Sequence, residues 1–313
     1  MSINWFPGHM HKATREIRER LPDIDVIIQV VDARLPYSSA NPVIAALSKT
    51  TPCLKVLSKS DLADPHLTEQ WLTALAEDER VNAMAVSTQQ PASIKQLVTL
   101  CKRLPGVKAN SLGEITALIT GIPNVGKSTL INTLAGRIAA KAGNEPAVTQ
   151  RQQRIDLRNG LVLIDSPGIL WPKIDNPNSG YRLALSGAIK ATAMSESDVG
   201  LFAAEFLLAQ HPDILRQRYQ LTDLPANGTE VLEAIGRRRG CLGSGGHVDF
   251  ERTGTLLINE YRNGKLGRLT LETPDQVANE EGRLEQIRAK RAAEKDAQAK
   301  QRKQAFKDRQ QQP

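Results

Sequence analysis

Residues 121–129, GIPNVGKST, have the residue types and the spacing needed to hold a chain of phosphates. The glycines permit a tight loop whose backbone N–H groups surround phosphate oxygens at the start of a helix. Lys127 would reach the terminal phosphates, and the Ser128 hydroxyl would bind Mg²⁺. An apolar run precedes the loop and a helix-like stretch follows it, which is the context that this chemistry requires. The residues predicted to contact the nucleotide here are Asn124, Val125, Gly126, Lys127, Ser128 and Thr129.

Two further segments are expected around the terminal phosphate. Thr149, in the polar loop NEPAVTQRQQ, is placed to complete the Mg²⁺ coordination when a triphosphate is bound. In VLIDSPGIL, Asp165 would hold Mg²⁺ through a water, and the N–H of Gly168 would contact the γ-phosphate. Many nucleotide hydrolases carry a water-orienting glutamine directly after such a DxxG segment. Here that residue is Ile169, which cannot orient a water by hydrogen bonding.

The segment LSKSD at 57–61 predicts that the base is guanine. Asp61 would accept hydrogen bonds from N1–H and the exocyclic amino group of guanine, a donor pair that adenine lacks. The stem of Lys59 would cover the ring. The residues predicted to form this part of the site are Ser58, Lys59, Ser60, Asp61, Ser87 and Thr88, the last two contacting the base edge from the end of the next strand.

Strand-like and helix-like segments alternate before residue 178. The strand-like runs are 25–36, 53–61 with its loop, 82–88, 114–120 and the two halves of 154–165, which flank a predicted two-residue turn at Asn159-Gly160. The helix-like segments are 13–21, 41–49, 67–79 and 92–104. This alternation predicts an α/β fold with a doubly wound, mostly parallel sheet. From about residue 180 the pattern is mainly helical, in 181–192, 198–210 and 229–240.

The order of the motifs is unusual, because most GTPases have the phosphate motifs first and the base motif last. Here LSKSD precedes GIPNVGKST, so we predict a circularly permuted P-loop GTPase domain at residues 1–178. Permutation is tolerated because domain termini often lie close together at the surface. A helical, RNA-binding domain is expected at 179–277 and a basic tail at 278–313. The segment after Gly168 then leads directly into the helical domain, so loss of the γ-phosphate could reposition that domain.

Composition limits the class of protein and of partner. The chain has 313 residues, is 40% hydrophobic, and has no stretch near the ~20 apolar residues of a membrane span. The N-terminus lacks an apolar signal core, and the three cysteines are few and far apart, so a cytoplasmic location is expected. The net charge of +7 favours polyanionic partners, and residues 279–313 hold ten Lys/Arg against six Asp/Glu. That segment is expected to be an exposed helix or a disordered tail.

Taken together, the motifs resemble those of the bacterial ribosome biogenesis GTPase A family (RbgA, also YlqF), whose GTPase domain is circularly permuted. The segments that carry the resemblance are NWFPGHM near the N-terminus, DARLP at 32–36, LSKSD, GIPNVGKST, the Thr149 loop and DSPG. They cover about the first 175 residues, and the remainder is similar as a helical domain of basic character. Ser58 stands where the family has Asn, a difference that bears on the strength of guanine binding.

The resemblance implies a GTP-hydrolysing factor for assembly of the large (50S) ribosomal subunit. Such a factor would couple its GTP state to binding and release of the subunit, would be stimulated by it, and would bind ribosomal RNA through the helical domain. Arg237–Arg239, the Gly-rich segment after them and the basic tail could contact phosphates. Mg²⁺ is the expected cofactor, and no membrane, metal cluster or oligomer is expected.

The resemblance also suggests how the attacking water is held. The side-chain oxygen of Asn124 could bind K⁺ beside the phosphates, although a turn-forming role is the alternative for this residue. The water could be oriented by that ion, by the partner, or by His9 in NWFPGHM, which we favour.

Three other functions are compatible with parts of the pattern. The chain could be a GTPase switch for a non-ribosomal protein or small-molecule partner. It could be an RNA-binding protein with a vestigial nucleotide site, although Lys127, Ser128, Thr149 and Asp165 are intact. An ATPase would leave Asp61 without a purpose.

Overall fold

The motifs are held by one six-stranded sheet. The computed structural model of the protein describes residues 8–47, 51–78, 81–140, 152–189 and 194–310. The strands are β1 (Val26–Asp32), β2 (Cys53–Ser58), β3 (Val81–Ala85), β4 (Ile115–Gly121), β5 (Gln153–Asp156) and β6 (Leu161–Asp165). They lie in the order β3-β2-β1-β4-β6-β5, and every neighbouring pair is parallel except β5 with β6. The predicted doubly wound, mostly parallel sheet of a permuted GTPase is confirmed.

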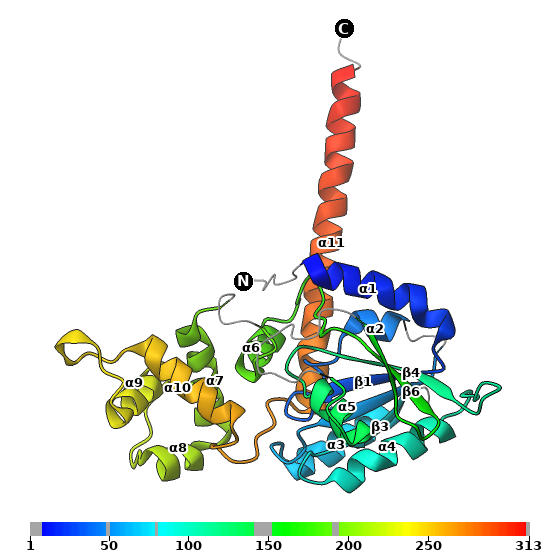
Figure 1. The fold of residues 1–313 in the computed structure, drawn as a ribbon. Helices are drawn as coiled ribbons and strands as arrows, with labels where there is room; N and C mark the ends of the chain where they lie inside the picture. The colour runs from blue at the N-terminus through cyan, green and yellow to red at the C-terminus, as the bar shows by residue number, and fades with distance from the viewer. Residues whose placement is uncertain (1–7, 48–50, 79–80, 141–151, 190–193, 311–313) are drawn as a thin grey trace. The chain divides into compact units, whose positions relative to one another are not determined.

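Helices cover both faces of this sheet, which explains why its strands are continuous apolar runs. Figure 1 shows α1 (Gly8–Arg20) and α2 (Pro42–Leu47) on one side, and α3 (Pro65–Ala76) and α4 (Pro91–Arg103) on the other. All seven residues of β1 are buried. A strand covered on both faces has no solvent-facing positions, so its sequence does not alternate.

A second group of helices follows the sheet and has its own hydrophobic cluster. These helices are α6 (Pro177–Ser186), α7 (Glu196–Gln210), α8 (Pro212–Tyr219), α9 (Gly228–Arg239) and α10 (Phe250–Arg262). Two glycines let α7 and α10 approach closely, because a Cβ on Gly200 would lie 2.5 Å from the Cα of Gly254. The expectation of a mainly helical C-terminal region is confirmed.

Residues 269–272, here called the return segment, lead the chain from the helices back to the sheet. The backbone N–H of Leu271 donates to the carbonyl of Arg34 at 2.7 Å, and that of Leu269 donates to Leu62 at 3.0 Å. The buried carboxylate of Glu272 accepts hydrogen bonds from the loop after β1 and lies 3.3 Å from Arg182 of α6. The helical region is therefore joined to the sheet both through α6 and through the return segment.

Several boundaries differ from the sequence-based expectation. α1 begins at Gly8 instead of Ala13, and α6 ends at Ser186 because Gly187 adopts φ +86° as its C-cap. The turn between β5 and β6 includes Arg158 as well as Asn159-Gly160, since the N–H of Leu157 donates to the carbonyl of Leu161. The sequence pattern predicts no separate helix at the positions of α8 and α10.

Residues 274–313 form a second compact unit. Within it, α11 (Pro274–Gln310) is a 37-residue helix, which is the helical one of the two alternatives expected for this basic segment. The division of the chain at residues 178 and 277 remains a prediction. Among the residues that the structure describes, no helix combines the length and the apolar character needed to cross a membrane.

Candidate functional site

The loop between β4 and α5 (Lys127–Ala135) is shaped as the phosphate motif requires. Asn124 and Gly126 both adopt positive φ, +58° and +92°, which turns the chain sharply before the helix. No side chain caps the N-terminus of α5, so its first N–H groups are available to a ligand. Ser128 is half-buried and Thr129 is exposed in this first turn. The strand, loop and helix context predicted for the motif is therefore present.

Lys127 and Asp165 form a buried ion pair in which Nζ and Oδ1 are 2.8 Å apart. Burial raises the pKa of Asp165 more than the nearby Lys127 lowers it. The other carboxylate oxygen, Oδ2, is buried without a hydrogen-bond partner among the described residues. A buried carboxylate oxygen in need of a partner fits a nearby Mg²⁺, since Mg²⁺ prefers oxygen ligands. Thr149, the other predicted Mg²⁺ ligand, lies outside the described residues.

The segment predicted to bind the base, LSKSD at 57–61, is here called the base loop and leaves the end of β2. It is hydrogen-bonded directly to the phosphate loop, the segment GIPNVGKST at 121–129. The Ser58 hydroxyl lies 2.6 Å from the carbonyl of Val125 and 2.9 Å from that of Val31. Lys59, at φ +56°, donates from Nζ to the carbonyl of Asn124 at 2.7 Å. Ser58 thus ties the two loops together through its hydroxyl, although it is not the Asn of the family motif.

Asp61 is held from the neighbouring strand end. The Ser87 hydroxyl donates to its Oδ1 at 2.7 Å, and the N–H of Gln89 donates to the Ser87 hydroxyl. The N–H of Ser60 bonds the carbonyl of Val86, which docks the base loop on the segment after β3. A carboxylate oriented in this way can use its other oxygen for a ligand, while Thr88 is exposed next to Ser87. Asp61 and Ser87, both predicted for the base site, thus lie in direct contact, and their binding of guanine stays a prediction.

Gly168 and Ile169 lie against the start of the phosphate loop. A Cβ on Gly168 would come within 2.9 Å of the Cα of Pro123, so this close approach requires glycine. The Ile169 N–H donates to the carbonyl of Gly121, and the Asn41 amide donates to the Ile169 carbonyl. The Ile169 side chain is completely buried in the core of the sheet domain. The position that often carries a water-orienting glutamine therefore serves packing in this chain.

His9 lies in the first turn of α1, beside the segment that follows Gly168. Its neighbour Met10 is fully buried, and the Met10 sulfur accepts a hydrogen bond from the N–H of Leu170 at 3.5 Å. The backbone of His9 is thus held next to the segment that follows Gly168.

Asn124 uses its side chain within the fold. Its Nδ2 donates to the carbonyl of Gly187, at the end of α6, over 2.7 Å. The phosphate loop is consequently linked to the start of the helical region as well as to the base loop.

Asp32 and Arg34 of DARLP, to which the motifs give no role, both lie beside the base loop. The Asp32 carboxylate accepts hydrogen bonds from Arg34 and from Lys59 Nζ. Burial disfavours the charged form, but Arg34 and Lys59 outweigh it and hold the pKa of Asp32 well below its usual value. The available signal was an acidic residue at the end of a buried strand next to the one that carries LSKSD.

Comparison with known proteins agrees with this geometry. A family model described as "50S ribosome-binding GTPase" matches residues 116–233. Ribosome biogenesis GTPase A of Priestia megaterium is 44% identical over 285 residues, which cover 88% of this chain and 99% of that protein. The chain belongs to the ribosome biogenesis GTPase A family. Another member, from Bacillus cereus, is 43% identical over 294 residues, or 92% of this chain and 99% of its own.

A solved structure extends the likeness to the fold. GNP-bound YlqF from T. maritima has a TM-score of 0.61 and is 25% identical, covering 85% of this chain and 99% of its own. The match to ribosome biogenesis GTPase A therefore includes the helical region as well as the motifs. The expected family and the expected fold are both confirmed.

Burial of Ile169 gives a testable expectation. Ile169→Gln places an amide in an apolar core without partners and should lower the free energy of unfolding by about 2 kcal/mol or more. Ile169→Val, which keeps the site apolar, should cost about 1 kcal/mol. Chemical denaturation measures both variants. A stable Ile169→Gln protein that hydrolyses GTP faster than the unaltered chain would contradict the buried placement.

Proposed function

We propose that this chain is a GTP-hydrolysing assembly factor for the large (50S) ribosomal subunit that couples its nucleotide state to subunit binding and release. As a member of the ribosome biogenesis GTPase A family it is a GTPase that acts in ribosome assembly. The observation that best supports binding of a guanine nucleotide is the hydrogen bond between the base loop and the phosphate loop, from Lys59 Nζ to the carbonyl of Asn124. A cytoplasmic location is part of the proposal.

The phosphates and their Mg²⁺ have candidate partners in this chain, all of which except Thr149 lie among the described residues. The N–H groups at the start of α5 and the Lys127 ammonium would hold the phosphates, because both present positive charge to them. Ser128 and Thr149 would bind Mg²⁺, with Asp165 acting through a water. When bound, Mg²⁺ neutralises charge on the β- and γ-phosphates. Gly168 would donate its N–H to the γ-phosphate, so the segment after it senses that group.

Guanine selectivity is assigned to Asp61. Asp61→Asn exchanges an acceptor oxygen for a donor amide, so affinity for GTP should fall at least about tenfold while affinity for xanthosine triphosphate rises. Asp213→Asn, an exposed aspartate in α8, is the control and should change neither. Competition binding measures all three proteins. Equal affinity of the unaltered protein for GTP and ATP would overturn the assignment.

We also propose His9 as the residue that positions the attacking water. Ile169, at the position where many nucleotide hydrolases carry the water-orienting glutamine, is buried and cannot contact the water. The contact between Met10 and Leu170 keeps the start of α1 beside the segment that follows Gly168. A neutral histidine can accept a hydrogen bond from water near neutral pH.

His9→Ala should therefore lose about a hundredfold of the GTP hydrolysis that large subunits stimulate, with nucleotide affinity retained. His11→Ala is the matched control, because His11 is an exposed histidine two residues further along α1. Turnover with and without purified 50S subunits, together with cosedimentation, measures the effect and tests the subunit as partner. If His9→Ala turns over at the unaltered rate on subunits, the water is held by another group.

Potassium is proposed as a second ion, next to Asn124. The positive φ and the bond from Nδ2 to Gly187 support the alternative role of this residue in shaping the loop. Substitution would disturb that loop, so the ion itself is the cleaner variable. Hydrolysis should be faster in KCl than in NaCl of equal concentration, and identical rates would remove potassium from the proposal.

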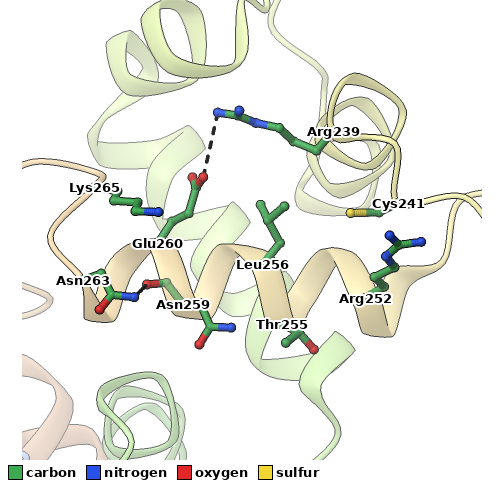
Figure 2. A pocket seen from close by; sticks show the side chains of 9 residues that line it. All are labelled: Arg239, Cys241, Arg252, Thr255, Leu256, Asn259, Glu260, Asn263 and Lys265. Carbon is green, nitrogen blue, oxygen red and sulfur yellow. Dashed lines mark hydrogen bonds and ion pairs between the residues drawn. The ribbon is translucent and has the colours of Figure 1, made fainter.

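The helical region is proposed to bind ribosomal RNA. A pocket of about 430 Å³ lies between the end of α9 and α10, and Figure 2 shows Arg239, Arg252 and Lys265 around it together with Asn259 and Asn263. The acidic residue of its lining, Glu260, is engaged by Arg218 at 2.7 Å, by the Tyr219 hydroxyl at 2.6 Å and by Arg239 at 3.8 Å, the last drawn as a dashed line in Figure 2. The remaining cationic and amide donors suit phosphate and sugar oxygens. Of the predicted Arg237–Arg239 run, Arg239 lines this pocket.

A further inference from the structure

Asp32 and Arg34 form a buried charged cluster that no step above uses. Both side chains are about 2% exposed. The Arg34 guanidinium grips the carboxylate with two nitrogens, Nε at 2.9 Å from Oδ1 and Nη2 at 2.8 Å from Oδ2. The backbone N–H of Arg34 also donates to Oδ1. This bidentate arrangement fixes the orientation of the carboxylate.

The fixed carboxylate in turn holds Lys59. Oδ2 of Asp32 accepts from Lys59 Nζ at 2.8 Å, and the same Nζ donates to the carbonyl of Asn124 at 2.7 Å. A lysine side chain has many rotamers, and each rotamer-rich side chain that a ligand must order weakens binding. With both bonds formed, the Lys59 stem is already ordered across the place assigned to the guanine ring.

The other side of Arg34 belongs to the helical region. Its guanidinium carbon lies 4.7 Å from the centre of the Tyr261 ring in α10, and Nη1 is 3.5 Å from the Tyr261 carbonyl. The Arg34 carbonyl accepts from Leu271 of the return segment. The Tyr261 hydroxyl is buried without a hydrogen-bond partner in the described structure, so within the Tyr261 side chain it is the ring that acts on Arg34.

We propose that Asp32 is a positioning residue of the nucleotide site: it preorders Lys59 for the guanine nucleotide and is itself oriented by Arg34, which the Tyr261 ring supports from the helical region. The proposal rests on the proposed GTP site and adds to it residues that do not touch the nucleotide. Nucleotide affinity then depends on a contact with α10 made through Arg34.

A double-mutant cycle tests the first step. Asp32→Asn should weaken binding of GTP about tenfold in the unaltered background and less than twofold in a Lys59→Met background, because its effect passes through Lys59. Binding of inosine triphosphate, which lacks the exocyclic amino group read by Asp61, should fall by the same factor as binding of GTP. A purely structural role for Asp32 would give equal losses in both backgrounds, and that result would overturn the proposal.

Tyr261 provides the second test, which holds even if Asp32→Asn fails to fold. Tyr261→Phe keeps the ring and removes the unpartnered hydroxyl, so GTP affinity should be unchanged. Tyr261→Leu removes the ring and should weaken GTP binding about threefold at a temperature where both variants are folded by circular dichroism. Equal affinity of the Phe and Leu variants would contradict the role of the ring.

The outcomes separate this inference from the proposed function. If the unaltered protein binds GTP no better than ATP, the guanine site itself is wrong. If it prefers GTP but Asp32→Asn costs as much in the Lys59→Met background as in the unaltered one, the guanine site stands and the positioning role of Asp32 fails. If the Tyr261 variants bind GTP equally, the guanine site stands and the role of the ring fails.

Discussion

The pairing of β1 with β2 on one side and β4 on the other is the constraint from which the site follows. Parallel pairing places the carboxyl ends of the three strands at one edge, where Asp32 faces Ser58 in register. The base loop leaves β2 and the phosphate loop leaves β4, so both must flank the end of β1. These motifs occur in a permuted order along the chain. A ligand at the carboxyl edge of the sheet contacts them by their positions across the sheet, which permutation leaves unchanged.

The neighbourhood of Asp32 shows why a buried anion is useful at this point. Two cations, Arg34 and Lys59, converge there from different strands, and each would be costly to bury alone. A single carboxylate pairs with both cations, and Lys59 in turn donates to the Asn124 carbonyl of the phosphate loop. The lowered pKa of Asp32 means that this charge persists throughout the physiological range.

Local pattern predicted much of this architecture, because strands covered on both faces and a phosphate loop between strand and helix have local signatures. Asp61 and Ser87 could be assigned to one site from sequence, since each follows a parallel strand of the same sheet, but the hydrogen bond between them could not. The burial of Ile169 and the return segment could not, because both depend on contacts between residues far apart in the chain. Helix ends were missed where a local residue decides them, as Gly187 does for α6.

The return segment has a consequence for how the protein unfolds. Glu272 and Arg182 are fully buried partners from the segment and from α6, and the Trp71 indole of α3 donates to the Glu272 carbonyl. Separating the sheet from the helical cluster would break the hydrogen bonds that Glu272 makes with the loop after β1 and with Trp71. Because these buried bonds join two hydrophobic clusters that belong to one compact unit, we expect the sheet and the helical cluster to unfold in one transition.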